Sequence, residues 1–573
     1  MGAFVSGRTL ESDCFLTGRK IMTTRPYRLA AVLIALVATA LLSCGGEEAV
    51  DDGEPLIGIK ILAGECNTGD GADYIDGGNI EEKLGSLAIQ FYTAAGTLVK
   101  VAGKNAVSLK NEELSESVKI TGIPNISNAR VVFSGFEVGN ISSPKWRGEV
   151  SGVNFTKGKT TAVTVVLYPV AGLGCFPRPL SVPRFGHTVT ELPDGRILIS
   201  GGFTELSNGI WQATDSVELL DPESGTIDQI AGMVSRRALH IAVLLPDGRV
   251  IFTGGVTALE TKKMTVADYP DMPLTLSFPA NGVEVYTVGL PKVNLRTSDI
   301  DQSVTDFIND SSAEFFPFQS YAYVRSDETT GNGTIFMAGG VSNGTAVTSI
   351  YGIDITVGDP VSVTITQKHS DKPLVAPLMA AAGSDKAFII GGHKASDTKF
   401  AHFVSNGSYD EWTGEALPNL FFGAIKADLA NDTIVAASGL ELPNGAGGFS
   451  MNNKGYKISP STSVRSEGAL FWGTWLHDLA LNTAGGYFTV TGGTGSSDLS
   501  QEKVEANNFL EHVSLETMDF GTKQAFDYFK VPRILHRVAV TADGRLFLIG
   551  GIQDLKGTTL VDTIELMQLV GSL

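Results

Sequence analysis

The sequence predicts an all-β fold built from a unit that recurs along the C-terminal part of the chain. Residues 184–202 read RFGHTVTELPDGRILISGG, an apolar strand, a turn at Pro193-Asp194-Gly195, a second apolar strand and a glycine pair. Segments close to it recur six more times before the C-terminus. A strand–turn–strand unit cannot bury its own apolar face, so the copies must stack on one another.

The seven copies align on their glycine pairs. They read HTVTELPDGRILISGG (187–202), HIAVLLPDGRVIFTGG (240–255), YAYVRSDETTGNGTIFMAGG (321–340), PLMAAAGSDKAFIIGG (377–392), AIKADLANDTIVAASG (424–439), HDLALNTAGGYFTVTGG (477–493) and HRVAVTADGRLFLIGG (536–551). Their Asp-Gly and Asn-Asp turns tolerate positive φ, which tight hairpins require. Copy five has Ser438 in place of the first glycine and is the poorest match, so six units remain an alternative to seven.

A third strand follows several copies, for example at 216–225, 282–289 and 562–570. Four short strands per unit are typical of a propeller blade. The last copy ends with three visible strands, and a ring loses its edges only when that blade is completed. We therefore expect a strand from residues 168–180 to pair with the seventh unit. Residues 258–281 and 296–316 indicate loop insertions, which carry recognition more often than strands do.

The repeated R-x-x-H…DGR…GG pattern resembles the kelch family, and most closely the bacterial kelch repeats related to the propeller of galactose oxidase. The resemblance covers residues from about 178 to 570. It implies a seven-bladed β-propeller over residues 173–573. Galactose oxidase holds copper with histidine and tyrosine ligands, one tyrosine being crosslinked to a cysteine. No cysteine follows Cys175 here, so that cofactor cannot be built, and we expect no cofactor and no metal.

The N-terminal segments indicate export and lipidation. Residues 22–44 have a basic start and a short apolar run ending in Leu41-Leu42-Ser43-Cys44, which is typical of a signal peptide. That ending resembles the bacterial lipobox, so we expect lipid on Cys44, with an incidental cysteine as the alternative. An acidic tether follows at 45–55, and residues 1–21 look like an over-extended start. We expect export across the inner membrane and a lipid anchor, in the outer membrane or at the cell surface.

Residues 56–172 predict a small β-sandwich of the immunoglobulin-like or prealbumin-like kind. Segments 86–103, 117–124, 129–140 and 160–170 read as strands broken by Gly, Pro and Asn. In an oxidising compartment Cys66 and Cys175 would form a disulfide worth roughly 4–5 kcal/mol in the chain-entropy model, with two buried thiols as the alternative. The Asp-rich loop 70–76 is a solvated loop by default, with a calcium site as the alternative.

Four of the eight histidines occupy one repeat position, and arginines precede three of them by three residues. Copies three, four and five carry Tyr321, Pro377 and Ala424 there. One arc of one face would then be a candidate site for an anion or a sugar. The alternative, which we favour, is that these side chains hydrogen-bond turns between blades. The arc comprises Arg184, His187, Arg237, His240, His477, Arg533 and His536.

The formal net charge of −19 argues against binding to nucleic acid or to an anionic membrane surface. The sequence has no HExxH, Walker or CxxC motif, and we expect no catalytic residues. The acidic pairs Asp354/Asp359 and Glu505/Glu511 read as surface loops. We expect a monomeric, non-enzymatic protein that binds a protein or a glycan at the cell envelope. The alternatives are a carbohydrate-active hydrolase or lyase using propeller-face carboxylates, and a structural envelope component.

Overall fold

The computed structural model describes residues 56–569 with gaps at 63–83, 111–112, 114–119, 141, 171, 261–275, 278–282, 288–318, 343–344, 359–360, 394–396, 443–448, 484, 497–502 and 519–525. No α-helix occurs in the described residues, whose regular elements are strands and short 3-10 turns such as η5 (Leu429–Asn431). The described part of the chain is therefore all-β, as predicted. No helix in these residues has the length and apolarity needed to cross a membrane. Segments 1–21, 22–44 and 45–55, Cys44 and the Asp-rich loop 70–76 lie outside the described residues.

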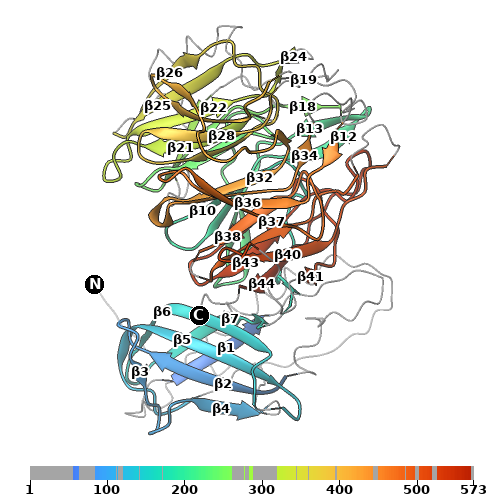
Figure 1. Ribbon diagram of the computed structural model, residues 1–573. Helices are drawn as coiled ribbons and strands as arrows, with labels where there is room; N and C mark the ends of the chain where they lie inside the picture. The colour runs from blue at the N-terminus through green and yellow to red at the C-terminus, as the bar shows by residue number, and fades with distance from the viewer. Residues whose placement is uncertain are drawn as a thin grey trace, which may run out of the picture. The chain divides into compact units, whose positions relative to one another are not determined.

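The N-terminal module consists of two sheets (Figure 1). Their buried side chains, such as Ile57, Leu87, Phe133 and Val165, form one core. A β-strand places alternate side chains on one face, and β2 follows this pattern over most of its length. The strand expected at 117–124 is reduced to a bridge between Ile57 and Ile120 in the described residues. The main sheet contains β3 (Leu98–Val99), β2 (Leu84–Tyr92), β5 (Ile126–Glu137), β6 (Trp146–Phe155) and β8 (Tyr168–Pro169), with β4 (Val107–Lys110) beside β2, and the second sheet pairs β1 (Leu56–Leu62) with β7 (Thr160–Val166) in parallel.

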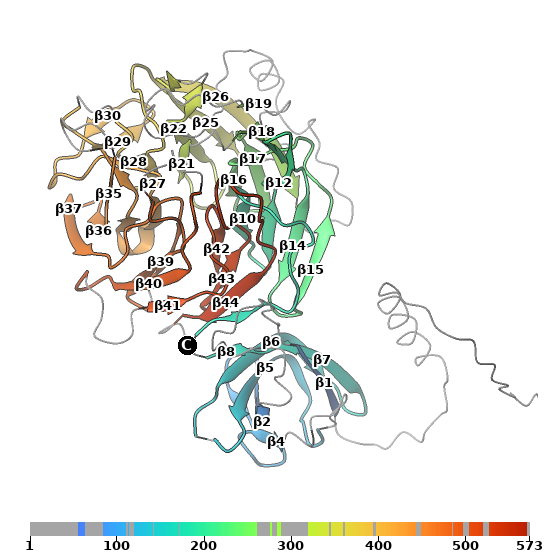
Figure 2. The same cartoon turned by 90° about the vertical axis from the view of Figure 1, so that its right-hand side faces the viewer.

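Seven antiparallel sheets then follow in sequence order, one for each repeat. Figure 2 shows first strands such as β10, β16, β21, β27 and β42 toward the middle of the array, with outer strands such as β15, β26, β30 and β37 at its rim. The first four sheets comprise β10 (Thr188–Glu191), β11 (Ile197–Ser200), β14 (Val217–Asp221) and β15 (Thr226–Ile230); β16 (Ile241–Leu244), β17 (Arg249–Thr253) and β20 (Val283–Thr287); β21 (Ser320–Arg325), β22 (Gly333–Ala338), β25 (Ile350–Thr356) and β26 (Ser362–His369); and β27 (Leu378–Ala381), β28 (Lys386–Ile390), β29 (Ala401–Ser405) and β30 (Tyr409–Glu411).

The last three sheets complete the series, and three further sheets are formed mainly by the connections between the second and third strands of a unit. The former comprise β32 (Ala424–Asp428), β33 (Thr433–Ala437), β36 (Lys454–Ser459) and β37 (Val464–Ala469); β38 (Asp478–Asn482), β39 (Tyr487–Thr491), β40 (Phe509–Ser514) and β41 (Phe526–Tyr528); and β42 (Arg537–Val540), β43 (Arg545–Ile549), β44 (Ile564–Gln568) and β9 (Gly174–Cys175). The latter comprise β12 (Phe203–Ser207), β13 (Ile210–Ala213), β18 (Ala258–Leu259) and β19 (Leu276–Ser277); β23 (Val341–Ser342) and β24 (Thr345–Ala346); and β31 (Leu420–Phe421), β34 (Leu440–Glu441) and β35 (Ser450–Met451).

The seventh sheet is completed from the other end of the repeat region. β9 pairs antiparallel with β44, Cys175 opposite Glu565, and the Phe176 N–H donates to the Ile564 carbonyl at 2.8 Å. The predicted pairing of a strand from residues 168–180 with the last unit is thus confirmed. Cys175 is disulfide-bonded, and its predicted partner Cys66 lies outside the described residues.

The fifth repeat is a complete unit despite its missing glycine. Ser438 has φ +51°, close to the φ of +61° at Gly201, the corresponding glycine of the first unit. The Ser438 hydroxyl donates to the Asn452 carbonyl at 2.7 Å and accepts from the Thr474 N–H at 2.7 Å. These two bonds offset the strain of a left-handed backbone at a residue with a Cβ.

A chain of backbone hydrogen bonds links neighbouring units near their first strands. In every unit but the third, whose counterpart at position 318 lies outside the described residues, the residue just before the histidine position has positive φ. In five units its N–H donates to the equivalent carbonyl of the preceding unit. The Gly186 N–H donates in this way to Leu535, which joins the seventh unit to the first at 3.0 Å. The other bonds are Leu239 to Gly186 (2.6 Å), Phe422 to Ala376 (3.2 Å), Leu476 to Phe422 (3.1 Å) and Leu535 to Leu476 (3.0 Å).

A second series of bonds uses the repeated glycines. The second glycine of one unit donates its N–H to the carbonyl of the residue that occupies the Arg184 position in the next unit. Gly551 donates to Arg184 at 2.8 Å, again joining the last unit to the first. A Cβ on the adjacent Gly550 would lie 2.6 Å from the Arg184 carbonyl oxygen, which explains why this position lacks a side chain. The other bonds are Gly202 to Arg237, Gly392 to Leu420, Gly439 to Thr474 and Gly493 to Arg533.

Substitution of Gly550 by alanine tests the contact between the last and first units. Gly550→Ala adds a Cβ at φ +60° that also approaches Cε1 of His187 at 2.7 Å. We expect a loss of about 3 kcal/mol or more in the free energy of unfolding, measured by denaturant titration, because backbone strain and overlap add.

Gly195→Ala is the matched control, since Gly195 has φ +84° and no heavy atom within 4 Å of its added Cβ. Strain alone should cost about 1 kcal/mol there. Equal losses for the two variants would contradict a close contact between the seventh and first units.

Candidate functional site

The three arginines of the predicted arc are fully buried. Each guanidinium donates to the carbonyl of the first glycine of its own unit: Arg184 to Gly201 at 2.8 Å, Arg237 to Gly254 at 2.8 Å and Arg533 to Gly550 at 3.1 Å. A carbonyl at a left-handed turn lies outside the sheet ladder, and the guanidinium supplies its donor. The arginines thus hold the end of the second strand in place.

A buried glutamate on the third strand faces each arginine. The N–O distance is 3.4 Å for Arg184–Glu218, 2.6 Å for Arg237–Glu284 and 2.6 Å for Arg533–Glu565. Each carboxylate also accepts backbone N–H groups from the segment leading into its unit, at 2.7 and 3.0 Å in the case of Glu284. We call each such pair an Arg–Glu clamp. Buried ion pairs are tolerated when hydrogen bonds satisfy both partners.

The clamps correct the expectation that these arginines hold a ligand's carboxylate. Their guanidinium groups already face carboxylates of the chain itself, and their side chains have no exposed surface. An incoming anion would have to displace a buried partner of the same charge. The favoured structural interpretation fits better, although the bonds lie within each unit rather than between blades.

The four histidines of the arc are also buried, and three of them pack against the preceding unit. A Cβ on Gly201, Gly492 or Gly550 would lie 2.8, 2.8 and 2.7 Å from Cε1 of His240, His536 and His187, respectively. The imidazole therefore fills the space that the missing side chain leaves. His240 and His536 also bond to the hydroxyls of Thr188 and Thr491 in the preceding unit, at 3.0 and 2.8 Å.

Burial keeps these imidazoles neutral. It lowers the pKa of His477 to about 4 and that of His536 to about 3, the latter with a contribution from the Arg533 charge. It also holds the pKa values of His187 and His240 well below the usual range. The arc therefore presents no cationic imidazole at neutral pH.

The strand register changes two of the predicted histidine equivalents. Ser320 pairs with Ala338 and Ala424 pairs with Ala437, as Thr188 pairs with Ser200 in the first unit. The histidine position is consequently occupied by Gln319 in unit three and by Gly423 in unit five, not by Tyr321 and Ala424. Pro377 keeps its predicted place because Leu378 pairs with Ile390. The longer turn of copy three and the missing glycine of copy five misled the alignment.

The sixth unit keeps the glutamate of the clamp without its arginine. Thr474 stands at the arginine position and donates its hydroxyl to the Gly492 carbonyl at 2.7 Å. Glu511 is fully buried and accepts the N–H groups of Phe471 and Trp472 at 2.7 and 3.2 Å. Burial raises the pKa of Glu511 to about 7. The sequence interpretation of Glu511 as a surface loop was wrong, because the residue lies within β40.

The other acidic residues considered in the sequence fall in different surroundings. Glu505 is exposed, as expected. Asp354 lies in β25, where it pairs with Lys368 at 2.7 Å and accepts from Thr334 at 2.6 Å. Asp359 lies outside the described residues. No group of three metal-ligating side chains occurs in the part of the chain that the structure describes.

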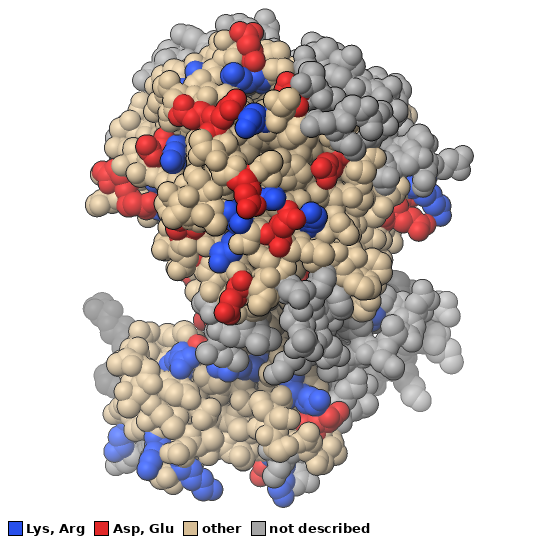
Figure 3. All heavy atoms as spheres, in the orientation of Figure 1, with Lys and Arg blue, Asp and Glu red and all other residues tan. Residues whose placement is uncertain are grey.

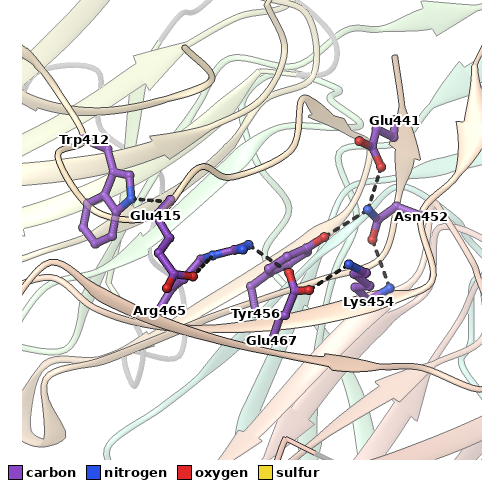
Figure 4. Close-up of polar contacts among 8 residues, drawn as sticks. All are labelled: Trp412, Glu415, Glu441, Asn452, Lys454, Tyr456, Arg465 and Glu467. Atoms are coloured by element: carbon purple, nitrogen blue, oxygen red, sulfur yellow. Dashed lines mark hydrogen bonds and ion pairs between the residues drawn. The ribbon is translucent and has the colours of Figure 1, made fainter. Parts of the chain in front are cut away.

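The fifth unit replaces the clamp with a different polar network. Tyr456 occupies the glutamate position, opposite Ala436. Its hydroxyl accepts from the Asn452 side chain at 3.1 Å, and the same amide donates to Glu441 at 2.9 Å (Figure 4). Farther along the network, Glu467 accepts from Lys454 and Arg465 at 2.8 and 2.9 Å. The glutamate position of the repeat thus tolerates another polar side chain where nearby residues can pair with it.

A cavity of about 400 Å³ lies among the first strands, and we call it the axial cavity. Asp478, Lys426 and Arg537 supply charged groups to its lining, and His240 and His477 reach it from the arc. Asp478 accepts the Val538 N–H at 2.9 Å. Burial alone would raise the pKa of Asp478, but Lys426 and Arg537 outweigh it and hold that pKa below its usual range. The cavity therefore combines a fixed anion with two cations.

The outer surface offers no comparable concentration of charge on the face shown. Figure 3 shows acidic and basic side chains interspersed over the C-terminal sheets.

No protein-family model and no curated protein matches the chain. The axial cavity is therefore the candidate site on its own geometry.

Glu511 predicts an unusual pH dependence of stability. Its pKa is about 7 in the folded protein and near the ordinary 4.5 after unfolding, so the folded state binds the proton more tightly. The free energy of unfolding should rise by about 2 kcal/mol as pH falls from 8 toward 5. Glu511→Gln should remove this contribution, as measured by denaturant titration at each pH.

Glu284→Gln is the control, because it breaks an intact clamp and leaves Arg237 buried without its carboxylate. It should cost about 3–5 kcal/mol at both ends of that pH range. If Glu511→Gln keeps the wild-type pH dependence, the buried Glu511 carboxyl does not titrate as its surroundings indicate.

Proposed function

We propose that residues 173–573 form a closed seven-bladed propeller of the kelch type, preceded by an immunoglobulin-like or prealbumin-like sandwich at 56–172. Three observations support closure: β9 completes the seventh sheet, Gly186 donates to Leu535 and Gly551 donates to Arg184. β10 and β42, the first strands of the first and seventh units, also contact each other. A ring closed in this way leaves no open blade edge for aggregation.

The function that we propose is non-enzymatic binding of a glycan or protein at the cell envelope, with the axial cavity as the ligand site. The cavity carries the proposal, because its 400 Å³ lies in the range of small-molecule sites. Lys426 and Arg537 can hold a carboxylate, while Asp478 and the neutral imidazoles can accept or donate hydrogen bonds to hydroxyls. An acidic sugar presents both kinds of group.

The alternative of a carbohydrate-active hydrolase finds less support in this cavity. Glycoside hydrolysis ordinarily needs two carboxyl groups on either side of the bond, one of them protonated. Asp478 is the one carboxylate among the described residues that line the axial cavity. Its lowered pKa suits an anion that orients a ligand rather than a general acid.

The envelope location rests on the N-terminal signal. We propose that the chain is cleaved before Cys44, lipidated there and anchored through the acidic tether, which would place the propeller outside the inner membrane. Mass spectrometry of the mature protein should find a lipid-modified Cys44 as the first residue. An unmodified N-terminus, or one at another position, would contradict the anchor.

Titration calorimetry with galacturonate and glucuronate oligosaccharides tests the axial site. Lys426→Ala should weaken binding about tenfold, because a charge-assisted hydrogen bond contributes about 1.4 kcal/mol or more. Lys503→Ala, whose side chain is 74% exposed, is the matched control and should leave affinity unchanged. The proposal fails if no acidic oligosaccharide binds, or if Lys426→Ala binds as the wild type does.

A further inference from the structure

The fourth unit contains a second cavity, of about 540 Å³, which we call the side pocket. It lies where the Arg–Glu clamp would be. His402 pairs with Ile389 in β28 as Glu218 pairs with Ile199 in β11, so His402 stands at the glutamate position. Leu374 stands at the arginine position, and both residues line the pocket. Replacing two clamp residues by Leu and His has opened a space that three other units fill.

Aromatic rings stack along this pocket. The His402 ring stacks on Tyr409 at a centroid distance of 4.3 Å and an interplanar angle of 23°, and His393 lies 5.1 Å from His402. The Lys372 ammonium lies 4.5 Å from the centroid of the Tyr409 ring. Asn419 fixes the backbone of His393 through two hydrogen bonds, at 3.0 and 2.9 Å. The rings are therefore held in place without a ligand.

Two polar atoms of these rings lack hydrogen-bond partners within the described residues. They are Nδ1 of His402, whose residue is only 7% exposed, and the buried hydroxyl of Tyr409. An unpaired buried polar atom costs roughly 1–3 kcal/mol, and native proteins rarely keep one without a reason. Two such atoms in one cavity are available to pair with a ligand.

The charges of the pocket define the ligand further. Burial lowers the pKa of His402 to about 3, and that of His393 falls below its usual range, so both rings are neutral. Asp397, which lies 3.3 Å from Nδ1 of His393, and Glu411 add negative charge, and Lys372 and Lys399 add positive charge. Such a mixture gives no strong preference for an anion or a cation. A hydroxyl both donates and accepts, so it can pair with imidazole, phenol, carboxylate and ammonium alike.

We propose that the side pocket is a binding site for an uncharged sugar, of one or two rings, separate from the axial cavity. The sugar hydroxyls pair with Nδ1 of His402, the Tyr409 hydroxyl, Asp397 and Lys372. This site does not depend on the ligand proposed for the axial cavity, since none of these residues lines that cavity.

The test is titration of the full mature chain with galactose, glucose, mannose, lactose and cellobiose, followed by calorimetry or saturation-transfer NMR. At least one of them should bind with a dissociation constant of about 1 mM or tighter. Tyr409→Phe and His402→Phe keep the aromatic rings and remove the unpaired polar atoms. Each should weaken binding about tenfold without lowering the melting temperature, since the atoms removed have no partner in the described protein.

Tyr456→Phe is the control, because it removes a tyrosine hydroxyl at the clamp-glutamate position of the fifth unit, the position that His402 occupies in the fourth, and it should leave sugar affinity unchanged. Lys426→Ala should also leave it unchanged. The proposal is overturned if none of the five sugars binds, or if Tyr409→Phe and His402→Phe bind as the wild type does. It is also overturned if Lys426→Ala abolishes binding, since the sugar would then occupy the axial cavity.

Discussion

The hydrogen bond from the second glycine of one unit to the carbonyl at the arginine position of the next constrains most of the other features. It requires the two backbones to approach so closely that a Cβ at Gly550 would lie 2.6 Å from the Arg184 oxygen. The paired left-handed residues that permit this approach end the second strand and turn carbonyls away from the sheet. In three units a buried arginine pairs with those carbonyls, and a glutamate then has to pair with the arginine. One close approach thus accounts for the glycine pair, the arginine and the glutamate together.

The units that lack the clamp differ in how they pair the buried polar groups at the arginine and glutamate positions. These differences produce the unusual buried carboxyl of the sixth unit and the side pocket of the fourth. In the sixth unit a threonine hydroxyl replaces the guanidinium, which leaves Glu511 buried without a cation. In the fifth, Tyr456 and Asn452 form a network with local partners. In the fourth, Leu374 and His402 leave a cavity with unpaired polar atoms. A repeat fold keeps its scaffold when one copy changes, because each copy contacts mainly its neighbours.

Several features could be predicted because they depend on local pattern. Glycine pairs marked six units, three of which also have an Asp-Gly turn. The edge that a three-stranded last unit would expose predicted the pairing of β9 with β44. The fifth copy could not be decided from sequence, since a serine at positive φ is not distinguishable there from a missing turn. The clamp glutamates could not be predicted from sequence. Each lies 32 to 50 residues from its arginine and from the backbone N–H groups that donate to it, and this separation differs from one unit to the next. The same gap in sequence hid the burial of Glu511 and the position of His402 in the repeat.

The sequence by itself determined the all-β class, the repeated unit, the turns and the arginine and histidine positions, because those depend on residues close together in the chain. Only the tertiary structure decided what the arginines and histidines do. Their partners come from the third strand of the same unit or from the preceding unit, and burial makes the histidines neutral. The two cavities were likewise decided by packing, since each collects side chains from separate segments whose proximity no local pattern encodes.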